Sequence, residues 1–126
     1  MTQEYRFYGE VISEAGLGPV SGALTHCSWK ICLCISGYDG THYLKTPRAP
    51  GEQREIELEM DSGQSRRFLF GGAIQGTTER AFSLLKDFSQ CLTAGGFAHR
   101  VELYDDTTEI GYFQHQWPHG QHEPIA

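Results

Sequence analysis

The sequence is short of basic residues and lacks the short motifs that mark the common catalytic sites. Its 126 residues include 10 Lys and Arg against 16 Asp and Glu, which gives a net charge of −6. Nucleic acids and anionic membranes both attract clustered basic surfaces, so the acidic balance argues against both kinds of partner. The chain has no nucleophile elbow, glycine-rich phosphate loop or HExxH zinc motif. The composition therefore favours a binding domain over an enzyme.

Long hydrophobic runs are missing as well. No apolar run is long enough to cross a bilayer, and the first residues carry no basic segment followed by an apolar one. We therefore expect a cytoplasmic protein without a secretion signal or a membrane partner. The four cysteines form no CxxC pair, and a chain of this length can bury a core without disulfides. We expect four reduced thiols, no bound metal and no other cofactor.

The apolar patterns predict an α+β fold, with a mostly antiparallel sheet of about six or seven strands and one helix packed on one face. The expected strands are residues 4–14, 22–36, 41–44, 54–61, 66–72, 97–104 and 109–117. A loop is expected at residues 16–19, which contain two glycines and a proline. Residues 1–117 would form a single α+β domain, and residues 118–126 a loose C-terminal tail.

The expected helix covers residues 78–93. Apolar residues recur there at three- and four-residue steps and form one stripe, made of Ala81, Leu84, Leu85, Phe88, Cys91 and Leu92. Thr77 or Thr78 is placed to cap the start of the helix, and Gly95-Gly96 to end it in a left-handed conformation. The stripe predicts that this helix packs against the sheet.

Residues 54–61 predict a strand with one apolar face and one acidic face. Because side chains alternate along a strand, Ile56, Leu58 and Met60 point one way. The other face carries four acidic residues, Glu55, Glu57, Glu59 and Asp61. The helix is expected to cover the apolar side of the sheet, which leaves the acidic face in solvent.

The apolar residues on the two arms of the following hairpin predict its register. Pairing Met60 with Phe68 keeps the apolar sets together and places Asp61 opposite Arg67. Residues 63–65 would form the loop. On this pairing two glutamates of the acidic face have no basic partner within the hairpin.

Four like charges on one face have three interpretations. A charged solvent face protects a sheet against aggregation, carboxylates can bind a basic protein, and paired carboxylates can act as general acid and base. The first is the commonest, and a flat, wet strand disfavours the third. Tyr38 and Tyr43 flank one turn, and tyrosine is favoured in interfaces. The predicted partner-binding residues are Glu55, Glu57, Glu59, Asp61, Tyr38 and Tyr43.

Three histidines near the end of the chain have the spacing of metal ligands on a helix. They are His115, His119 and His122. Pro118 and Gly120 oppose a helix there, however, so a solvated tail is favoured over a metal site.

His26 and Cys27 raise the question of a thiol nucleophile. Neighbours in a strand point to opposite faces, so the base would have to be His42 or His99, brought close by the fold. A buried, inert cysteine is the favoured interpretation.

Two segments after the helix, residues 99–106 (HRVELYDD) and 111–118 (GYFQHQWP), resemble small bacterial toxin-immunity proteins. Proteins of this type are acidic single domains that bind a secreted antibacterial effector and block its active site. The resemblance covers about a third of the chain. It implies a cognate toxin as the partner and assigns no role to any single residue.

We therefore expect a non-enzymatic protein-binding domain that binds a basic protein through an acidic and aromatic surface. The resemblance specifies this as an immunity protein that blocks a cognate toxin. Two alternatives stay open. One is a small hydrolase or thiol enzyme that uses His with Asp or Cys, and the other is a secretion chaperone or adaptor, which would form a homodimer.

Overall fold

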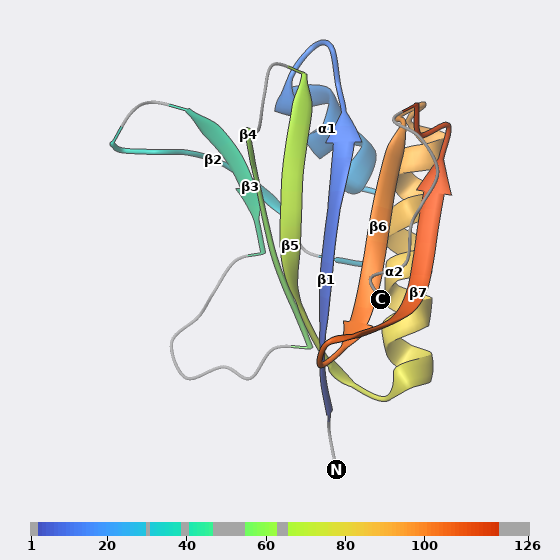
Figure 1. The fold of residues 1–126 in the computed structure, drawn as a ribbon. Coiled ribbons are helices and arrows are strands. Elements are labelled where there is room, and N and C mark those ends of the chain that lie inside the picture. The colour runs from blue at the N-terminus through green and yellow to red at the C-terminus, as the bar shows by residue number, and fades with distance from the viewer. Residues whose placement is uncertain (1–2, 30, 39–40, 47–54, 63–65, 119–126) are drawn as a thin grey trace.

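The computed structural model describes residues 3–118 except 30, 39–40, 47–54 and 63–65. Within these residues seven strands form one antiparallel sheet in the order β2-β3-β4-β5-β1-β6-β7 (Figure 1). The strands are β1 Gln3–Ile12, β2 Cys32–Ile35, β3 His42–Lys45, β4 Ile56–Ser62, β5 Arg67–Gly76, β6 His99–Asp105 and β7 Thr108–His115. The expected α+β fold with its antiparallel sheet is confirmed.

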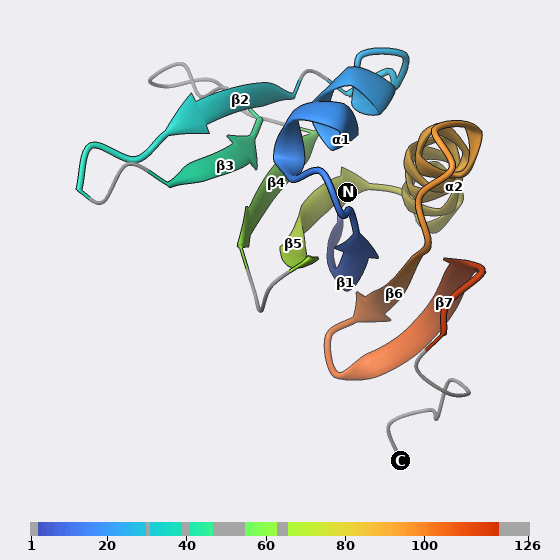
Figure 2. The ribbon, with the colours of Figure 1, turned by 90° about the horizontal axis from the view of Figure 1, so that it is seen from above.

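Both helices of the described chain, α1 Leu17–Leu24 and α2 Thr78–Ala94, lie on the same face of the sheet (Figure 2). Buried aromatic rings join them to it. Phe88 of α2 stacks on Trp29 with ring centroids 4.7 Å apart, and it meets Phe70 of β5 at 5.2 Å. None of the described helices covers the opposite face of the sheet, which we call the open face.

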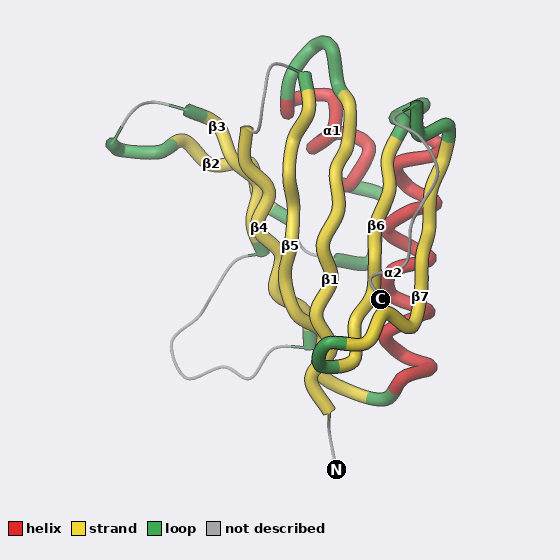
Figure 3. The backbone as a smooth tube through the Cα atoms, in the orientation of Figure 1, coloured by secondary structure: helices red, strands yellow, loops and turns green. Residues whose placement is uncertain are grey.

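The path of the chain places β1 in the interior of the sheet. β1 pairs antiparallel with β5 on one side and with β6 on the other. After β1 the chain passes through α1 to the far edge strand β2 and returns through β3 and β4 to β5 (Figure 3). It then crosses through α2 to β6 and β7. The open face therefore combines residues that are far apart in the sequence.

α2 confirms the predicted helix and is one residue longer. Five residues of its apolar stripe are buried, and Cys91 is half-buried. The Thr77 hydroxyl oxygen accepts a hydrogen bond from the backbone N–H of Arg80 at 3.2 Å, which is the expected N-cap. Gly96, with φ of 83°, takes the left-handed conformation after the helix.

The expected loop at residues 16–19 and the expected strand at 22–36 are wrong. Helix α1 occupies much of this region because Leu17, Val20 and Leu24 recur at helical spacing and bury one face. Pro19 fits in its first turn, where backbone N–H groups have no helical partner. Only Cys32–Ile35 of the expected strand pairs in the sheet.

The β4–β5 hairpin has the predicted faces but not the predicted register. Asp61 pairs with Leu69 instead of Arg67, a shift of two residues. Because strand side chains alternate with a period of two, this shift leaves every side chain on its predicted face. The predicted pairing of Asp61 with Arg67 is wrong, and Arg67 instead forms an ion pair with Glu10 of β1.

Candidate functional site

A row of directly paired residues crosses the open face from β3 to β7. It consists of Lys45, Glu59, Gly71, Tyr8, Glu102 and Tyr112. Paired residues of neighbouring strands share a face, so these side chains point to the same side of the sheet. We call this set the transverse row.

Gly71 leaves a gap in the transverse row between Glu59 and Tyr8. The result is a shallow depression lined by these residues together with Leu69 and Phe70. A Cβ atom added at Gly71 would lie 3.2 Å from the Tyr8 ring. The Tyr8 and Leu69 side chains beside the depression are 51% and 49% exposed, respectively. The open face therefore presents an aromatic ring, an aliphatic side chain and a carboxylate at one point.

A network of ion pairs lies next to this depression, centred on Glu10. The Glu10 side chain is only 11% exposed, and its carboxylate bonds to Arg67 of β5 and to Arg100 of β6. The Arg67 Nε–Glu10 distance is 2.9 Å and the Arg100 Nη2–Glu10 distance is 2.8 Å. Burial alone would raise the pKa of Glu10, but the hydrogen bonds from Arg67 and Arg100 lower it. Glu10 is therefore held ionised.

Two aromatic residues extend the network toward the C-terminal edge of the sheet. The Trp117 ring lies 5.6 Å from both guanidinium groups of Arg67 and Arg100, in cation–π geometry. Arg100 also bonds to Glu102 at 2.5 Å, and the Tyr104 hydroxyl donates to the same carboxylate at 2.6 Å. In this part of the open face, two carboxylates and two guanidinium groups neutralise one another.

The predicted acidic residues separate into two groups. Glu57 and Glu59 are exposed on β4 and form no ion pair with any residue that the structure describes. Glu55 precedes β4 and bonds instead to Arg80 of α2, at 2.9 and 3.0 Å. The Arg80 hydrogen bond lowers the pKa of Glu55. The side chain of Asp61 lies outside the described part of the chain.

The two predicted tyrosines lie away from the depression, toward the β2 edge. Tyr38, at the turn of the β2–β3 hairpin, is 99% exposed. This hairpin extends away from the rest of the sheet (Figure 1). Tyr43 is half-buried on β3, with the ammonium of Lys45 5.8 Å from its ring. Tyr43 therefore borders the transverse row, whereas Tyr38 is separate from it.

Tyr8, Leu69 and the Glu10 network are not among the residues that the sequence predicts for the site. Alternation along residues 4–10 places Tyr8 and Glu10 on the same, polar face of a strand. Nothing in that pattern shows that β1 lies beside β5, which brings Tyr8 next to the acidic strand.

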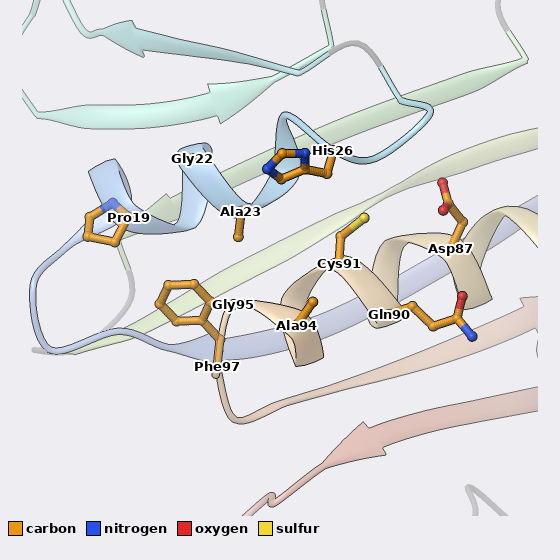
Figure 4. Close-up of a pocket in the computed structure, with 10 residues that line it drawn as sticks. All are labelled: Pro19, Gly22, Ala23, His26, Asp87, Gln90, Cys91, Ala94, Gly95 and Phe97. Carbon is orange, nitrogen blue, oxygen red and sulfur yellow. The ribbon is translucent and has the colours of Figure 1, made fainter.

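A second concavity lies on the helix side of the sheet, between α1 and α2 (Figure 4). Its cavity has a volume of about 680 Å³. Polar side chains gather toward one end, where His26, Asp87 and Cys91 are found, and Pro19 and Phe97 lie toward the other. The predicted neighbours His26 and Cys27 are in a turn after α1 rather than in a strand.

Asp87 is fixed in place at the polar end of this cavity. Its Oδ2 accepts hydrogen bonds from the Ser28 N–H at 2.9 Å, the Ser28 hydroxyl at 2.7 Å and the Cys27 thiol at 3.5 Å. The bonds from Ser28 lower the pKa of Asp87 in spite of its partial burial. Burial raises the pKa of both Cys27 and Cys91, and the Asp87 charge raises them further. The thiols beside Asp87 are therefore held protonated.

Among the remaining candidate histidines of the described chain, His99 and His115 are paired neighbours on β6 and β7, and His42 lies apart from them on β3. His99 is fully buried, with Nε2 2.7 Å from the Ser89 hydroxyl and Nδ1 2.8 Å from the Phe97 carbonyl oxygen. His115 is half-buried with its ring 6.1 Å from that of His99, and His42 is exposed on β3. His119 and His122 lie outside the described residues. Among the residues that are described, no group of three or more metal-binding side chains is assembled.

None of the described helices is long and apolar enough to span a membrane. Comparison of the chain with protein-family models, with curated proteins and with solved structures found no match.

Proposed function

We propose that this protein binds a basic protein partner on the open face of its sheet. The observation that carries the proposal is the side-by-side arrangement of Glu59, Gly71 and Tyr8 on β4, β5 and β1, with Tyr8 and Leu69 about half exposed. Both described helices pack on the other face, so this arrangement is accessible to a macromolecule (Figure 2).

The depression at Gly71 fits the side chain of an arginine or lysine from the partner. A guanidinium group lying over Gly71 would contact the Glu59 carboxylate on one side and the Tyr8 ring on the other. Leu69 would be buried at the same time. Interfaces obtain most of their affinity from a few such buried aromatic and aliphatic side chains, surrounded by a polar rim.

Glu57 and Glu59 supply the electrostatic part of the proposal. Neither has an ion-pair partner among the described residues, so both carboxylates are available to a cationic surface. The net charge of the protein, −6, is also negative and would attract a basic partner. Opposite charges accelerate association, and salt weakens this effect. Binding is therefore expected to weaken as ionic strength rises.

The specific biological form that we propose is an immunity protein, whose basic partner is a cognate bacterial toxin. This form follows from the resemblance of residues 99–106 and 111–118 to that class and is compatible with an uncovered, acidic sheet face. Such a protein would work by occupying the active site of the toxin.

The alternative of a thiol enzyme receives less support. A nucleophilic cysteine needs a lowered pKa and an adjacent base. The pKa values of Cys27 and Cys91 are raised, and the neighbouring Asp87 charge opposes thiolate formation. His99 is buried against Ser89 and away from solvent.

The test uses the purified product of the gene adjacent to this one and measures its binding by calorimetry. We expect the double variant Glu57→Lys/Glu59→Lys to weaken binding at least tenfold, and Gly71→Val to weaken it by filling the depression. The matched control is Glu14→Lys/Glu79→Lys, which changes the net charge equally at two exposed positions outside the transverse row. This control should bind like the wild type.

Two results would overturn the proposal. One is unchanged affinity in both open-face variants, and the other is equal weakening in the charge-matched control. The immunity form has its own readout: co-expression with the adjacent gene product should restore bacterial growth, and the double variant should fail to do so. If the adjacent gene product binds the open face but is not toxic, the immunity form is rejected and the proposed binding of a basic partner stands.

A further inference from the structure

The cavity between α1 and α2 has the features of a small-molecule site. Its volume of about 680 Å³ lies in the usual range for ligand pockets. Figure 4 shows its lining drawn from both helices and from Phe97, just after α2. It lies on the helix side of the sheet and is therefore separate from the open face. No residue of the proposed protein-binding surface lines it.

Asp87 supplies one fixed negative charge at the polar end. All three of its hydrogen bonds go to Oδ2, so Oδ1 accepts none from a described residue. Asp87 also forms no ion pair within the described chain. A carboxylate that is held by its neighbours but lacks a cation is complementary to a cationic group.

Besides Asp87, the lining has polar side chains in His26 and Gln90, and the rest of it is largely apolar. Pro19, Ala23, Ala94 and Phe97 contribute carbon surface along the length of the cavity. Asp87 and Ala94 are seven residues apart on α2, so they are about 10 Å apart along the helix, which rises 1.5 Å per residue. An extended chain of about eight carbons has this length. The cavity therefore combines a charged end with an apolar channel.

We propose that this cavity binds an elongated organic cation, with a terminal ammonium group at Asp87 and an apolar chain that runs along α2 toward Phe97. His26, whose ring forms no hydrogen bond with a described residue, lines the same end and is available to a further polar group of the ligand. Charge would select the ligand class, and burial of the chain would select its length.

The test uses alkyl ammonium ions as probes and follows the amide NMR shifts of the full chain. Butylamine, hexylamine and octylamine should shift the amide signals around the cavity, with Kd improving about two- to fourfold for each added methylene. Octan-1-ol and octanoate, of equal length, should bind at least tenfold more weakly than octylamine. Equal binding of the alcohol and the amine would reject the role of the charge.

Two variants assign the binding to the cavity. Asp87→Asn should weaken the binding of octylamine at least tenfold. Ala94→Leu should also weaken this binding, because the larger side chain occupies the channel while the Asp87 carboxylate stays intact. Ala94 is exposed at the end of α2, so a larger side chain there does not enter the core. Glu79→Gln, on the same helix but outside the lining, is the matched control and should change nothing. Octylamine binding that survives both cavity variants, or no shift with any amine at 10 millimolar, overturns the proposal.

Discussion

Glu10 joins three strands of the open face through a single carboxylate. It is nearly buried, and both of its partners, Arg67 and Arg100, are cations. Replacing Glu10 with Gln would leave two guanidinium groups without their counter-charge. We expect the free energy of unfolding in urea to fall by about 1–3 kcal/mol at neutral pH. As a control, Glu4→Gln removes the acidic partner of the exposed ion pair with Arg6. This variant should change the free energy of unfolding by less than about 0.5 kcal/mol.

His99 makes stability depend on pH. The Phe97 carbonyl can only accept, so Nδ1 carries the proton and Nε2 accepts from the Ser89 hydroxyl. Burial lowers the pKa of His99 below its ordinary value of 6.5. The unfolded chain therefore binds a proton more readily than the folded protein. The neutral, buried imidazole of His99 therefore contributes its full stability above the pKa that histidine has in the unfolded chain. This stability is lost as pH falls below that pKa and toward the lowered pKa of the folded protein.

We expect the free energy of unfolding of the wild type to decline between pH 7.5 and 5, and His99→Gln to flatten that decline. His42→Gln, at an exposed position on β3, serves as the control and should retain the wild-type slope. Glu10 contributes little in this range, because its stabilisation is lost only as pH falls through the ordinary value of 4.5 toward its lowered pKa. Equal slopes in wild type and His99→Gln would contradict this assignment.

At the scale of single elements, α2 depends on its N-cap. The Thr77 hydroxyl satisfies the backbone N–H of Arg80, one of the donors that the first turn leaves free. Thr77→Ala should lower the free energy of unfolding by about 0.5–2 kcal/mol, measured by urea denaturation. Thr77→Ser keeps the oxygen and should recover most of the loss. If Ser behaves like Ala, the hydroxyl is not the stabilising group.

The two helices show what a local pattern can and cannot predict. α2 is predictable because its apolar stripe repeats over several turns and is bounded by Thr77 and Gly96. α1 has eight residues, among them two glycines and a proline, and these residue types are typical of loops. Its three buried residues suffice for a helix only because α2 and the sheet provide a surface for them. That surface is tertiary information.

The register of the β4–β5 hairpin shows a second limit on what the sequence predicts. The alternation of residues 56–62 predicts which side chains are buried, and Leu58 and Met60 are indeed in the core. Registers that differ by two residues bury the same side chains, so alternation cannot choose between them. The ion pair of Arg67 with Glu10 instead of Asp61 therefore could not be predicted from the hairpin alone.

At the scale of the whole molecule, one aromatic cluster connects the layers. Phe88 of α2 contacts both Trp29 and Phe70, and Phe7 of β1 contacts the same two rings. Phe88→Ala should lower the free energy of unfolding by about 3–5 kcal/mol, because it opens a cavity where the helix meets the sheet. Tyr38→Ala, at a fully exposed ring, should leave the urea midpoint within error of the wild type. A small loss for Phe88→Ala would mean that the core collapses around the missing ring.

The open face illustrates why a site is harder to predict than a fold. The exposure of Glu57 and Glu59 follows from alternation within one strand, and the sequence predicts it. Their neighbour Tyr8 comes from a strand that is remote in the chain, so the depression at Gly71 exists only in the assembled sheet. The same holds for Trp117, which folds back over two arginines of other strands.

The interior position of β1 also constrains how the chain reaches this structure. Ile12 pairs with Arg67, and Arg6 pairs with Tyr104, so both partners of β1 are synthesised long after it. Pairings between distant segments carry a large loop-closure cost and form slowly. During translation β1 leaves the ribosome with both edges unpaired, and they stay unpaired until β5 and β6 have followed. The interval between the synthesis of β1 and that of β6 is therefore the period in which the nascent chain is most exposed to aggregation and to chaperones.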